Sequence, residues 1–294
     1  MNRDLKIPEI DFRNIQQKDF EFNLISASQL LDLGNENTGQ PFHPHRLLFY
    51  AILFVMEGEG HHFIDFKRYS YRKGSIIFIS KEQVQAFEPN PKLRAYLMIF
   101  TKKFLERSSL GSNLMQQLSL YNYHLYPPVL HLNDSQLDTF SALVLRIKEE
   151  FFAPDDFATE EIIQASLKIL LFSAERMRKT TLDPQKQSFY FDEFQQFQQL
   201  LQDHIFESRQ VKFYADEMQI STKKLNRITY EIMQQPAKSY IDQYLILEIK
   251  RFLMNTALSI KEISYKAGFE APTNFVKYFK KFEKMTPAAF RKQY

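Results

Sequence analysis

Residues 259–291 read SIKEISYKAGFEAPTNFVKYFKKFEKMTPAAFR, and their apolar side chains recur at the spacing of two short helices. Gly268 lies between the two apolar stripes and can adopt the left-handed backbone of a tight turn. Pro272 is tolerated in the first turn of the second helix. The stripes comprise Ile260, Ile263 and Ala267, followed by Phe275, Phe279 and Phe282. This pattern predicts a helix-turn-helix.

The second of these helices turns its polar residues away from the apolar stripe. Hydroxyl, amide and ammonium groups of this kind can contact the base edges and phosphates of DNA, although a merely solvated helix surface has a similar composition. The outward residues are Thr273, Asn274, Lys277, Lys280 and Lys281. A nucleic-acid-binding surface is therefore one of two interpretations of this helix.

The same stretch resembles the AraC family of bacterial transcription regulators. The resemblance rests on the spacing of Ile260, Glu262, Ile263, Gly268, Phe269, Phe275, Phe279, Lys280, Lys281, Thr286, Pro287, Phe290 and Arg291. It extends back to about residue 190 and, more weakly, over the rest of the chain. The resemblance implies two helix-turn-helix regions joined by one long helix, binding to double-stranded DNA, and RNA polymerase as a further candidate partner.

A first helix-turn-helix is expected at residues 214–232. Ser221 is a favourable N-cap for a helix whose apolar stripe is Leu225, Ile228 and Ile232. By the resemblance, certain residues of the second helix in each region face the bases, and neighbouring lysines contact phosphates. The implied base-facing residues are Lys223, Asn226, Arg227, Thr273, Asn274 and Lys277, and the phosphate-contacting residues are Lys224, Lys280 and Lys281.

Residues 236–256 are predicted to form the helix that joins the two regions. Their apolar residues, at helical spacing, are Ile241, Leu245, Ile249, Phe252 and Leu253. About twenty residues at about 1.5 Å each give a rod of about 30 Å. Successive major-groove faces on one side of B-DNA are about 34 Å apart. One chain is therefore expected to present both recognition helices to adjacent turns of the duplex.

A few residues depart from the family pattern. Gln234 and Lys284 stand where glycine is usual, so both helix ends must form without glycine's conformational freedom. Leu245 and Ile249 replace the usual Arg and Ala of the joining helix, and Ala271 replaces an acidic residue. These differences bear on the helix caps and on the packing of the joining helix, and they leave the fold prediction unchanged.

The composition predicts a folded chain of two domains with a cationic C-terminal part. The chain has 294 residues, of which 44% are hydrophobic, and no cysteine, which excludes disulfides, thiolate metal sites and cysteine nucleophiles. Residues 211–294 contain 15 Lys and Arg against 8 Asp and Glu, whereas residues 1–210 contain 23 against 27. The C-terminal part thus carries the charge that phosphate binding needs, although lysine-rich surfaces are also common elsewhere.

The N-terminus, MNRDLKIPEIDF, has no apolar signal region. The apolar stretch at residues 49–56 is far shorter than the roughly 20 residues of a membrane-spanning helix. We therefore expect a cytoplasmic protein without a membrane partner.

Residues 1–105 read as a succession of short strands. Runs at 19–26, 48–55, 61–66, 75–79 and 93–100 are rich in Phe and Ile, and glycine-containing turns separate several of them. This rhythm predicts a small double-sheet barrel. The order of His43-Pro44-His45, Val55-Met56-Glu57-Gly58, the segment YRKGS at residues 71–75 and Ile79 resembles the cupin-type sensor domain that often precedes the AraC-type module.

His43 and His45 have a spacing that would suit a metal, since alternate residues of a strand point to the same side. A metal-binding cupin also needs a later histidine, and the matching position is Gln85, whose amide is a poor transition-metal ligand. We therefore predict neither a metal nor another cofactor. His43, His45 and Gln85 remain candidates for contacting a small-molecule effector, and the alternative is that the histidines are structural.

Two longer helices are predicted after the barrel, at residues 135–151 and 157–178, with Asp134 and Ser135 as caps for the first. In the AraC family such helices commonly form a homodimer contact; otherwise they pack only on their own barrel. Residues 181–188 are polar and are expected to link a domain at 1–180 to one at 189–294.

The predicted fold class is α+β, with an N-terminal cupin-like β-barrel, appended helices and a C-terminal all-α domain of two helix-turn-helix regions joined by a long helix. The expected function is sequence-specific transcription regulation controlled by an effector. The alternatives are a constitutive regulator, a metal-dependent cupin enzyme fused to a DNA-binding domain, and an architectural DNA binder. We find no phosphate-binding Gly-rich loop and no Ser/His/Asp arrangement, so an enzyme is not expected.

Overall fold

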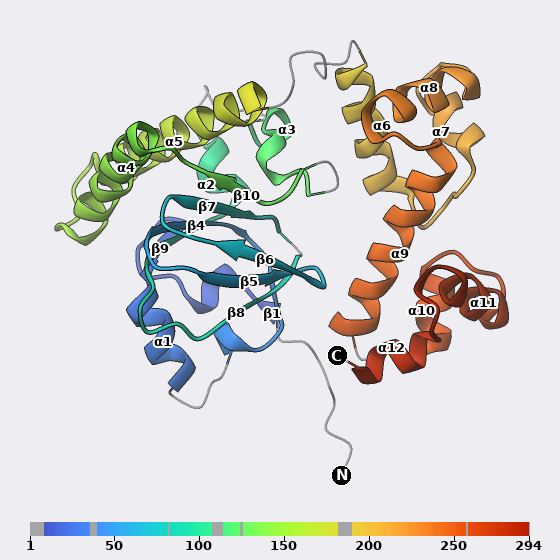
Figure 1. Ribbon diagram of the computed structural model, residues 1–294, viewed down its shortest axis with the longest axis horizontal. Helices are drawn as coiled ribbons and strands as arrows, with labels where there is room; N and C mark the ends of the chain where they lie inside the picture. Colours follow the sequence, from blue (N-terminus) through green and yellow to red (C-terminus); the bar gives the residue numbers. More distant parts are fainter. Residues whose placement is uncertain are drawn as a thin grey trace. The chain divides into compact units, whose positions relative to one another are not determined.

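The computed structural model describes residues 9–35, 40–81, 83–107, 114–123, 126–181, 190–256 and 258–293. It contains two compact units, an N-terminal domain that ends at Thr181 and a C-terminal domain whose described residues begin at Tyr190 (Figure 1). Of the linker expected at 181–188, only Thr181 lies within the described residues, and it ends a helix.

Two five-stranded sheets form the body of the N-terminal domain. The first has the order β1-β3-β8-β5-β6 and the second the order β10-β7-β4-β9-β2. The strands are β1 Glu9–Ile10, β2 Phe22–Ser26, β3 His45–Leu47, β4 Tyr50–Glu57, β5 Gly60–Ile64, β6 Lys67–Tyr71, β7 Ser75–Ile79, β8 Val84–Phe87, β9 Arg94–Phe100 and β10 Val129–His131. The predicted double-sheet architecture is confirmed.

Strands β4 and β7 are apolar at residues 51–56 and 76–79, because both of their faces are buried over most of this length. Leu53 and Ile77 contribute to a core that includes residues of both sheets, such as Ile64 of β5. Ile52 and Ile76, one residue earlier in each strand, point to the opposite face and join a second core that includes the domain's helices. Side chains alternate between faces along a strand, so a strand covered on both sides reads as a continuous apolar run.

Helices cover the outer face of the second sheet, as the ribbons of α4 and α5 above β7 show (Figure 1). The helices of the N-terminal domain are α1 Ala27–Asn35, α2 Lys102–Glu106, α3 Leu114–Gln117, α4 Asp134–Phe152 and α5 Thr159–Thr181, with 3-10 turns at Phe12–Asn14, Gln40–Phe42 and Ser119–Tyr121. The two long helices predicted after the barrel are thereby confirmed.

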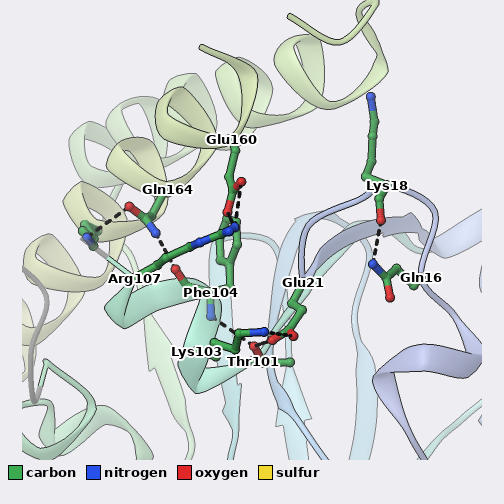
Figure 2. Close-up of polar contacts among 10 residues, drawn as sticks. Gln16, Lys18, Glu21, Thr101, Lys103, Phe104, Arg107, Glu160 and Gln164 are labelled. Atoms are coloured by element: carbon green, nitrogen blue, oxygen red, sulfur yellow. Dashed lines mark hydrogen bonds and ion pairs between the residues drawn. The ribbon is translucent and has the colours of Figure 1, made fainter. Parts of the chain in front are cut away.

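Polar contacts hold α2 between the sheet and α5 (Figure 2). Thr101 caps α2 by accepting a 3.1 Å hydrogen bond from the Phe104 N–H. The Phe104 carbonyl in turn accepts a hydrogen bond from Gln164 of α5. Arg107, just after α2, pairs with Glu160 of α5 at 2.8 Å. The first turns of α5 are thus anchored to the barrel through α2.

Some sequence predictions for this domain were wrong in detail. Asn133 rather than Asp134 or Ser135 caps α4, because it forms a reciprocal capping box with Gln136. The predicted runs did not include strands β1, β3, β6, β8 and β10 or helix α1. β6 reads KRYSY and has an intermediate or exposed surface at most positions, so it lacks the apolar signal on which the strand prediction relied.

The C-terminal domain is all helical. Its helices are α6 Phe191–His204, α7 Val211–Glu217, α8 Thr222–Met233, α9 Ala237–Asn255, α10 Ile260–Lys266, α11 Pro272–Glu283 and α12 Pro287–Gln293. Helix α9 runs between the pair α7–α8 and the pair α10–α11 (Figure 1) and contacts α7, α8, α10 and α12. Its buried residues include Ile241, Leu245 and Ile249. No described helix of either domain is long and apolar enough to span a bilayer.

Candidate nucleic-acid interface

The pairs α7–α8 and α10–α11 are two helix-turn-helix regions with equivalent turns. In the first, Gln219 has φ 54° and the N–H of Ile220 donates to the Ala215 carbonyl at 2.9 Å. In the second, Gly268 has φ 73° and the N–H of Phe269 donates to the Ser264 carbonyl at 3.0 Å. In each region a residue with left-handed backbone ends the first, supporting helix, which is α7 or α10. The chain then turns into the second, recognition helix, which is α8 or α11.

The recognition helices α8 and α11 begin as the sequence predicted. Ser221 caps α8 by accepting a 3.1 Å hydrogen bond from the Lys224 N–H, and Pro272 opens α11. Both helices end without glycine, because Gln234 and Lys284 themselves adopt left-handed conformations with φ 53° and 60°. The two departures from the glycine pattern therefore leave the helix ends intact, at the cost of backbone strain.

On α8, the cationic residues are exposed and two of them have partners within the domain. Lys223 and Arg227 are exposed, and the Arg227 guanidinium lies 5.5 Å from the ring centroid of Tyr190. Lys224 pairs with Glu193 of α6 at 2.9 Å. Since both side chains of that pair are partly exposed, it stabilises the fold by about 1 kcal/mol or less and can be exchanged for a phosphate contact.

Asn226 is only half-buried on α8, and its amide is engaged inside the domain. Its side-chain oxygen accepts a 3.0 Å hydrogen bond from the N–H of Ala237, the first residue of α9. Its side-chain nitrogen donates to the Thr222 carbonyl at 2.9 Å. Pro236 provides no side-chain cap for α9, so Asn226 supplies that cap from a neighbouring helix. Asn226 therefore has a structural role in this domain, and its base-facing role stays a prediction.

On α11, all five polar residues singled out in the sequence are exposed on the face opposite the buried Phe275 and Phe279. They are Thr273, Asn274, Lys277, Lys280 and Lys281. The acidic residue at the end of the helix, Glu283, pairs with Lys250 of α9 at 3.1 Å. These five residues therefore present hydroxyl, amide and ammonium groups on the exposed surface of α11.

In the barrel, the structure brings His45 of β3 and Gln85 of β8 together. The His45 Nδ1 lies 2.9 Å from the His43 carbonyl, which can only accept, so Nδ1 carries the proton. The Nε2 atom is then an acceptor, and Gln85 Nε2 donates to it at 2.8 Å. Both side chains are 2% exposed, and together they form a buried polar cluster.

His62 of β5 completes this cluster and was missed in the sequence. It is fully buried against Phe87. Within the described residues neither of its ring nitrogens has a hydrogen bond of normal geometry, although the Gln85 side chain lies close enough to raise the pKa of the ring against the effect of burial. Burial lowers the pKa of His62 to about 3, so its ring is neutral at physiological pH. Alternation along the strand, which also buries Ile64, is the signal that would have identified it as inward-facing.

His43 does not form a metal pair with His45. Strand β3 begins at His45, so the strand alternation on which the pairing depended does not reach His43, and its side chain is exposed. Among the described residues no group of three or more His, Asp or Glu side chains is arranged to hold a metal ion.

Comparisons with known proteins match both domains. The sequence model of the AraC-like ligand binding domain matches residues 33–167, and that of a helix-turn-helix domain matches residues 214–293. The transcriptional activator RhaS of Escherichia coli O81 (strain ED1a) is 21% identical over 252 residues, which are 85% of this chain and 87% of the relative.

Similar solved structures include ToxT from Vibrio cholerae, at 13% identity, with 92% of this chain and 94% of that chain covered and a TM-score of 0.43. The C-terminal domain of the two-component response regulator yesN from Fusobacterium nucleatum is 23% identical, with 34% of this chain and 98% of that chain covered and a TM-score of 0.32.

Proposed function

Because the chain belongs to the AraC family of transcription regulators, we propose that it binds a specific DNA sequence through α8 and α11 and that a small molecule in the N-terminal barrel controls this binding. The observation that carries the proposal is the pair of recognition helices, each with an exposed cationic and polar face, on either side of α9. We place the protein in the cytoplasm with its DNA, and we assign it no enzymatic reaction.

The exposed residues divide by chemistry into two roles. Arginine, asparagine and lysine side chains that enter the major groove distinguish bases, because their donors and acceptors match particular base edges. Lysines at the margins of a recognition helix fix the duplex through phosphates and carry no sequence information. We propose Lys223, Asn226, Arg227, Thr273, Asn274 and Lys277 for the bases and Lys224, Lys280 and Lys281 for the phosphates; Asn226 would combine this role with its contact to α9.

The direct test is selection of duplexes from a random pool by the full-length protein. We expect an enriched sequence with two short conserved segments, or boxes, one for each recognition helix. The boxes should lie about one turn of the duplex apart, because α9, which joins the two helix-turn-helix regions, is 19 residues and about 28 Å long. Recovery of unenriched sequence at high affinity would instead identify an architectural DNA binder, and failure to bind any duplex would contradict the proposal.

For the effector, the supporting observation is the buried cluster of His45, His62 and Gln85. In the described residues, both His62 nitrogens and the Gln85 side-chain oxygen lack a hydrogen bond of normal geometry. Buried polar atoms are usually paired, and hydroxyl or amide groups of a ligand would pair them. A ligand there would contact His45 and Gln85 as expected, together with His62 instead of the exposed His43.

Thermal-shift measurements of the full chain against sugars and other small metabolites test this site. A ligand of the barrel raises the melting temperature of the wild type, and the shift disappears in Gln85→Leu. A shift that persists in Gln85→Leu would place the ligand elsewhere. The absence of a shift with every class would favour a constitutive regulator. Metal analysis of the purified protein separates both from a metal-dependent enzyme.

We also propose that a second copy of the chain covers the outer surface of α4 and α5. Four large apolar side chains on these helices are between 37% and 56% exposed, namely Leu145, Phe152, Ile169 and Phe172. They lie on two long helices that contact each other, and exposed apolar side chains on one surface are typical of a protein interface. RNA polymerase remains a further candidate partner.

Sedimentation of the full-length protein tests the dimer. We expect a dimer for the wild type and a monomer for the double variant Ile169→Glu, Phe172→Glu. Leu33→Glu changes a comparably exposed leucine, 42% exposed on α1, and is the matched control. A dimer that survives the double variant would contradict this surface.

A further inference from the structure

The loop between α6 and α7, which lies beside the first helix-turn-helix, directly contacts the second. The guanidinium carbon of Arg209 in this loop lies 4.1 Å from the ring centroid of Phe269. Arg209 Nη2 also approaches the Gly268 carbonyl at 3.4 Å. Because Phe269 is only 5% exposed, this stacked cation is partly shielded from water, where cation–π attraction is stronger.

The same loop approaches the second turn so closely that no side chain fits between them. A Cβ added to Gly268 would lie 2.2 Å from the carbonyl oxygen of Phe206. The Phe206 ring, in turn, packs on Phe252 of α9 with 5.1 Å between ring centroids. Backbone therefore meets backbone across the two halves of the domain.

A set of polar contacts connects this loop to α9 and α11. Asp242 of α9, 8% exposed, accepts a 2.8 Å hydrogen bond from the Tyr278 hydroxyl of α11. It also accepts from Lys238 Nζ at 2.5 Å, and the same ammonium donates to the Arg209 carbonyl at 3.3 Å. The Arg209 guanidinium carbon lies 5.8 Å from the Tyr278 ring centroid, which closes the circuit.

We propose that these five residues, Arg209, Lys238, Asp242, Phe269 and Tyr278, fix the orientation of α11 relative to α8 and so determine the spacing of DNA boxes that the protein accepts. The inference rests on the proposed DNA-binding function. The length of α9 sets the distance between the two helix-turn-helix regions. The rotation of one region relative to the other about the axis of α9 is fixed by contacts that lie away from that axis. The five residues, hereafter the Arg209 circuit, provide such contacts.

The spacing of the boxes is sensitive to this orientation. One inserted base pair moves the second box by about 3.4 Å along the duplex and about 35° around it. A rigidly oriented α11 cannot follow that rotation, so wild-type binding to altered spacing loses the contacts of one recognition helix. A loosened second region can follow it, at the cost of a lower effective concentration at the original spacing.

The experiment measures the affinity of the full-length protein for its selected duplex with the original spacer and with one or two base pairs inserted or removed. For the wild type, we expect a loss of about tenfold or more per base pair, the size of a lost base contact. For Arg209→Ala, we expect about threefold or less, with weaker binding at the original spacing. Tyr278→Phe, which removes only the hydroxyl on Asp242, is expected to fall between them.

Lys292→Ala is the control for charge, because it removes one exposed cation from α12 outside the Arg209 circuit. Any loss of affinity in this variant is the same at every spacing, so the ratio between spacings stays at the wild-type value. Circular dichroism establishes that each variant is folded. If Arg209→Ala does not fold, Tyr278→Phe decides the matter, since it keeps the ring and its packing.

The outcomes separate the two proposals. A wild-type protein that selects no sequence overturns the proposed function, and this inference with it. A wild type that binds a selected sequence but tolerates every spacing overturns the inference alone. The inference is also overturned if Arg209→Ala and Tyr278→Phe both show the same ratio of affinities between spacings as the wild type. That result would leave the proposed DNA binding in place.

Discussion

Gly268 is required for the close approach of the α6–α7 loop more than for its own backbone angle. Gln219 holds the equivalent turn position in the first helix-turn-helix with φ 54°, so a side chain is compatible with that conformation. At Gly268 the obstacle is the Phe206 carbonyl, 2.2 Å from where a Cβ would stand. Backbone oxygen cannot rotate away as a flexible side chain can.

We therefore expect Gly268→Ala to lower the free energy of unfolding by more than about 2 kcal/mol, since strain and overpacking act together. Gly74→Ala is the comparison, because Gly74 also has a positive φ of 78° but its nearest neighbour would be 3.5 Å from the new Cβ. Urea unfolding of both variants measures the difference. Equal destabilisation would show that backbone angle alone matters at Gly268.

His62 makes the N-terminal domain sensitive to acid. Burial holds the pKa of the folded-state ring at about 3, while the unfolded chain takes up its proton near pH 6.5. Between these values the unfolded state binds more protons, so stability falls as the pH falls. Acidification from pH 7 to pH 5 is expected to cost about 2 kcal/mol through this residue.

Replacing His62 with Gln is expected to remove that part of the pH dependence, measured as the change in unfolding free energy between pH 7 and pH 5. His61→Gln is the matched control, because the neighbouring ring is on the other face of β5 and partly exposed. A pH dependence unchanged in His62→Gln would mean that folding does not lower the pKa of the ring.

At the level of single residues, the sequence predicted exposure well and hydrogen bonding poorly. The five polar residues of α11 lie on its surface because helical period alone places them there. The helical period also predicts an outward-facing Asn226 on α8. Its amide oxygen, however, caps the first N–H of α9, that of Ala237, eleven residues later in the chain. Helical periodicity carries no information about a partner on another helix, so this role required the structure.

The cap at the start of α9 can be tested by substitution. Asn226→Ala leaves the first N–H of α9 without its cap, and we expect a loss of stability of about 1 kcal/mol. If Asn226 acts only as a cap, DNA binding weakens for all sequences to the same degree. A changed preference at one base position would support its predicted base-facing role.

Recognition helices α8 and α11 both end at a strained residue that glycine would relieve. We expect Gln234→Gly and Lys284→Gly each to stabilise the protein by about 0.5–1 kcal/mol, measured by urea unfolding. Gln235→Gly is the comparison, because Gln235 is not among the described residues with positive φ. Glycine there adds freedom to the unfolded chain and removes the hydrogen bonds of Gln235 with Ser239 and Gln243, so it is expected to destabilise the protein. Destabilisation by both glycines would show that the side chains of Gln234 and Lys284 contribute more than their strain costs.

Prediction of helices and strands succeeded where apolar residues recur at a clear period and failed for the shortest strands. Helices α4, α5 and α9 each have 19 or more residues, and their apolar periods identified them. Strands β3 and β8 have three and four residues, too few to show alternation. Their pairing in the first sheet, which brings His45 beside Gln85, is a tertiary property.

At the scale of the whole molecule, the positive charge of the C-terminal part is expected to govern how binding depends on salt. Each neutralised phosphate releases counterions, so removing one phosphate contact lowers the slope of log affinity against log salt by about 1. Lys281→Ala should show this change and weaken binding to all sequences evenly. Arg227→Ala should instead relax the preference at one base position by about 1–3 kcal/mol.

Titration of the selected duplex and of single-base variants over a range of salt concentrations distinguishes these two effects. Lys292→Ala again serves as a cation replaced outside the proposed contacts. Equal losses on all sequences for Arg227→Ala and Lys281→Ala would contradict the division into base-reading and phosphate-binding residues.

Helix α9 limits how a protein of this architecture can acquire new targets in evolution. It contacts helices of both DNA-binding halves, and its core residues Ile241, Leu245 and Ile249 have no exposed surface. A substitution there disturbs both halves at once, whereas the outer side chains of α8 and α11 can vary singly. New operators are therefore reached by exchanging surface residues, while the helix between them stays under the constraints of a protein interior.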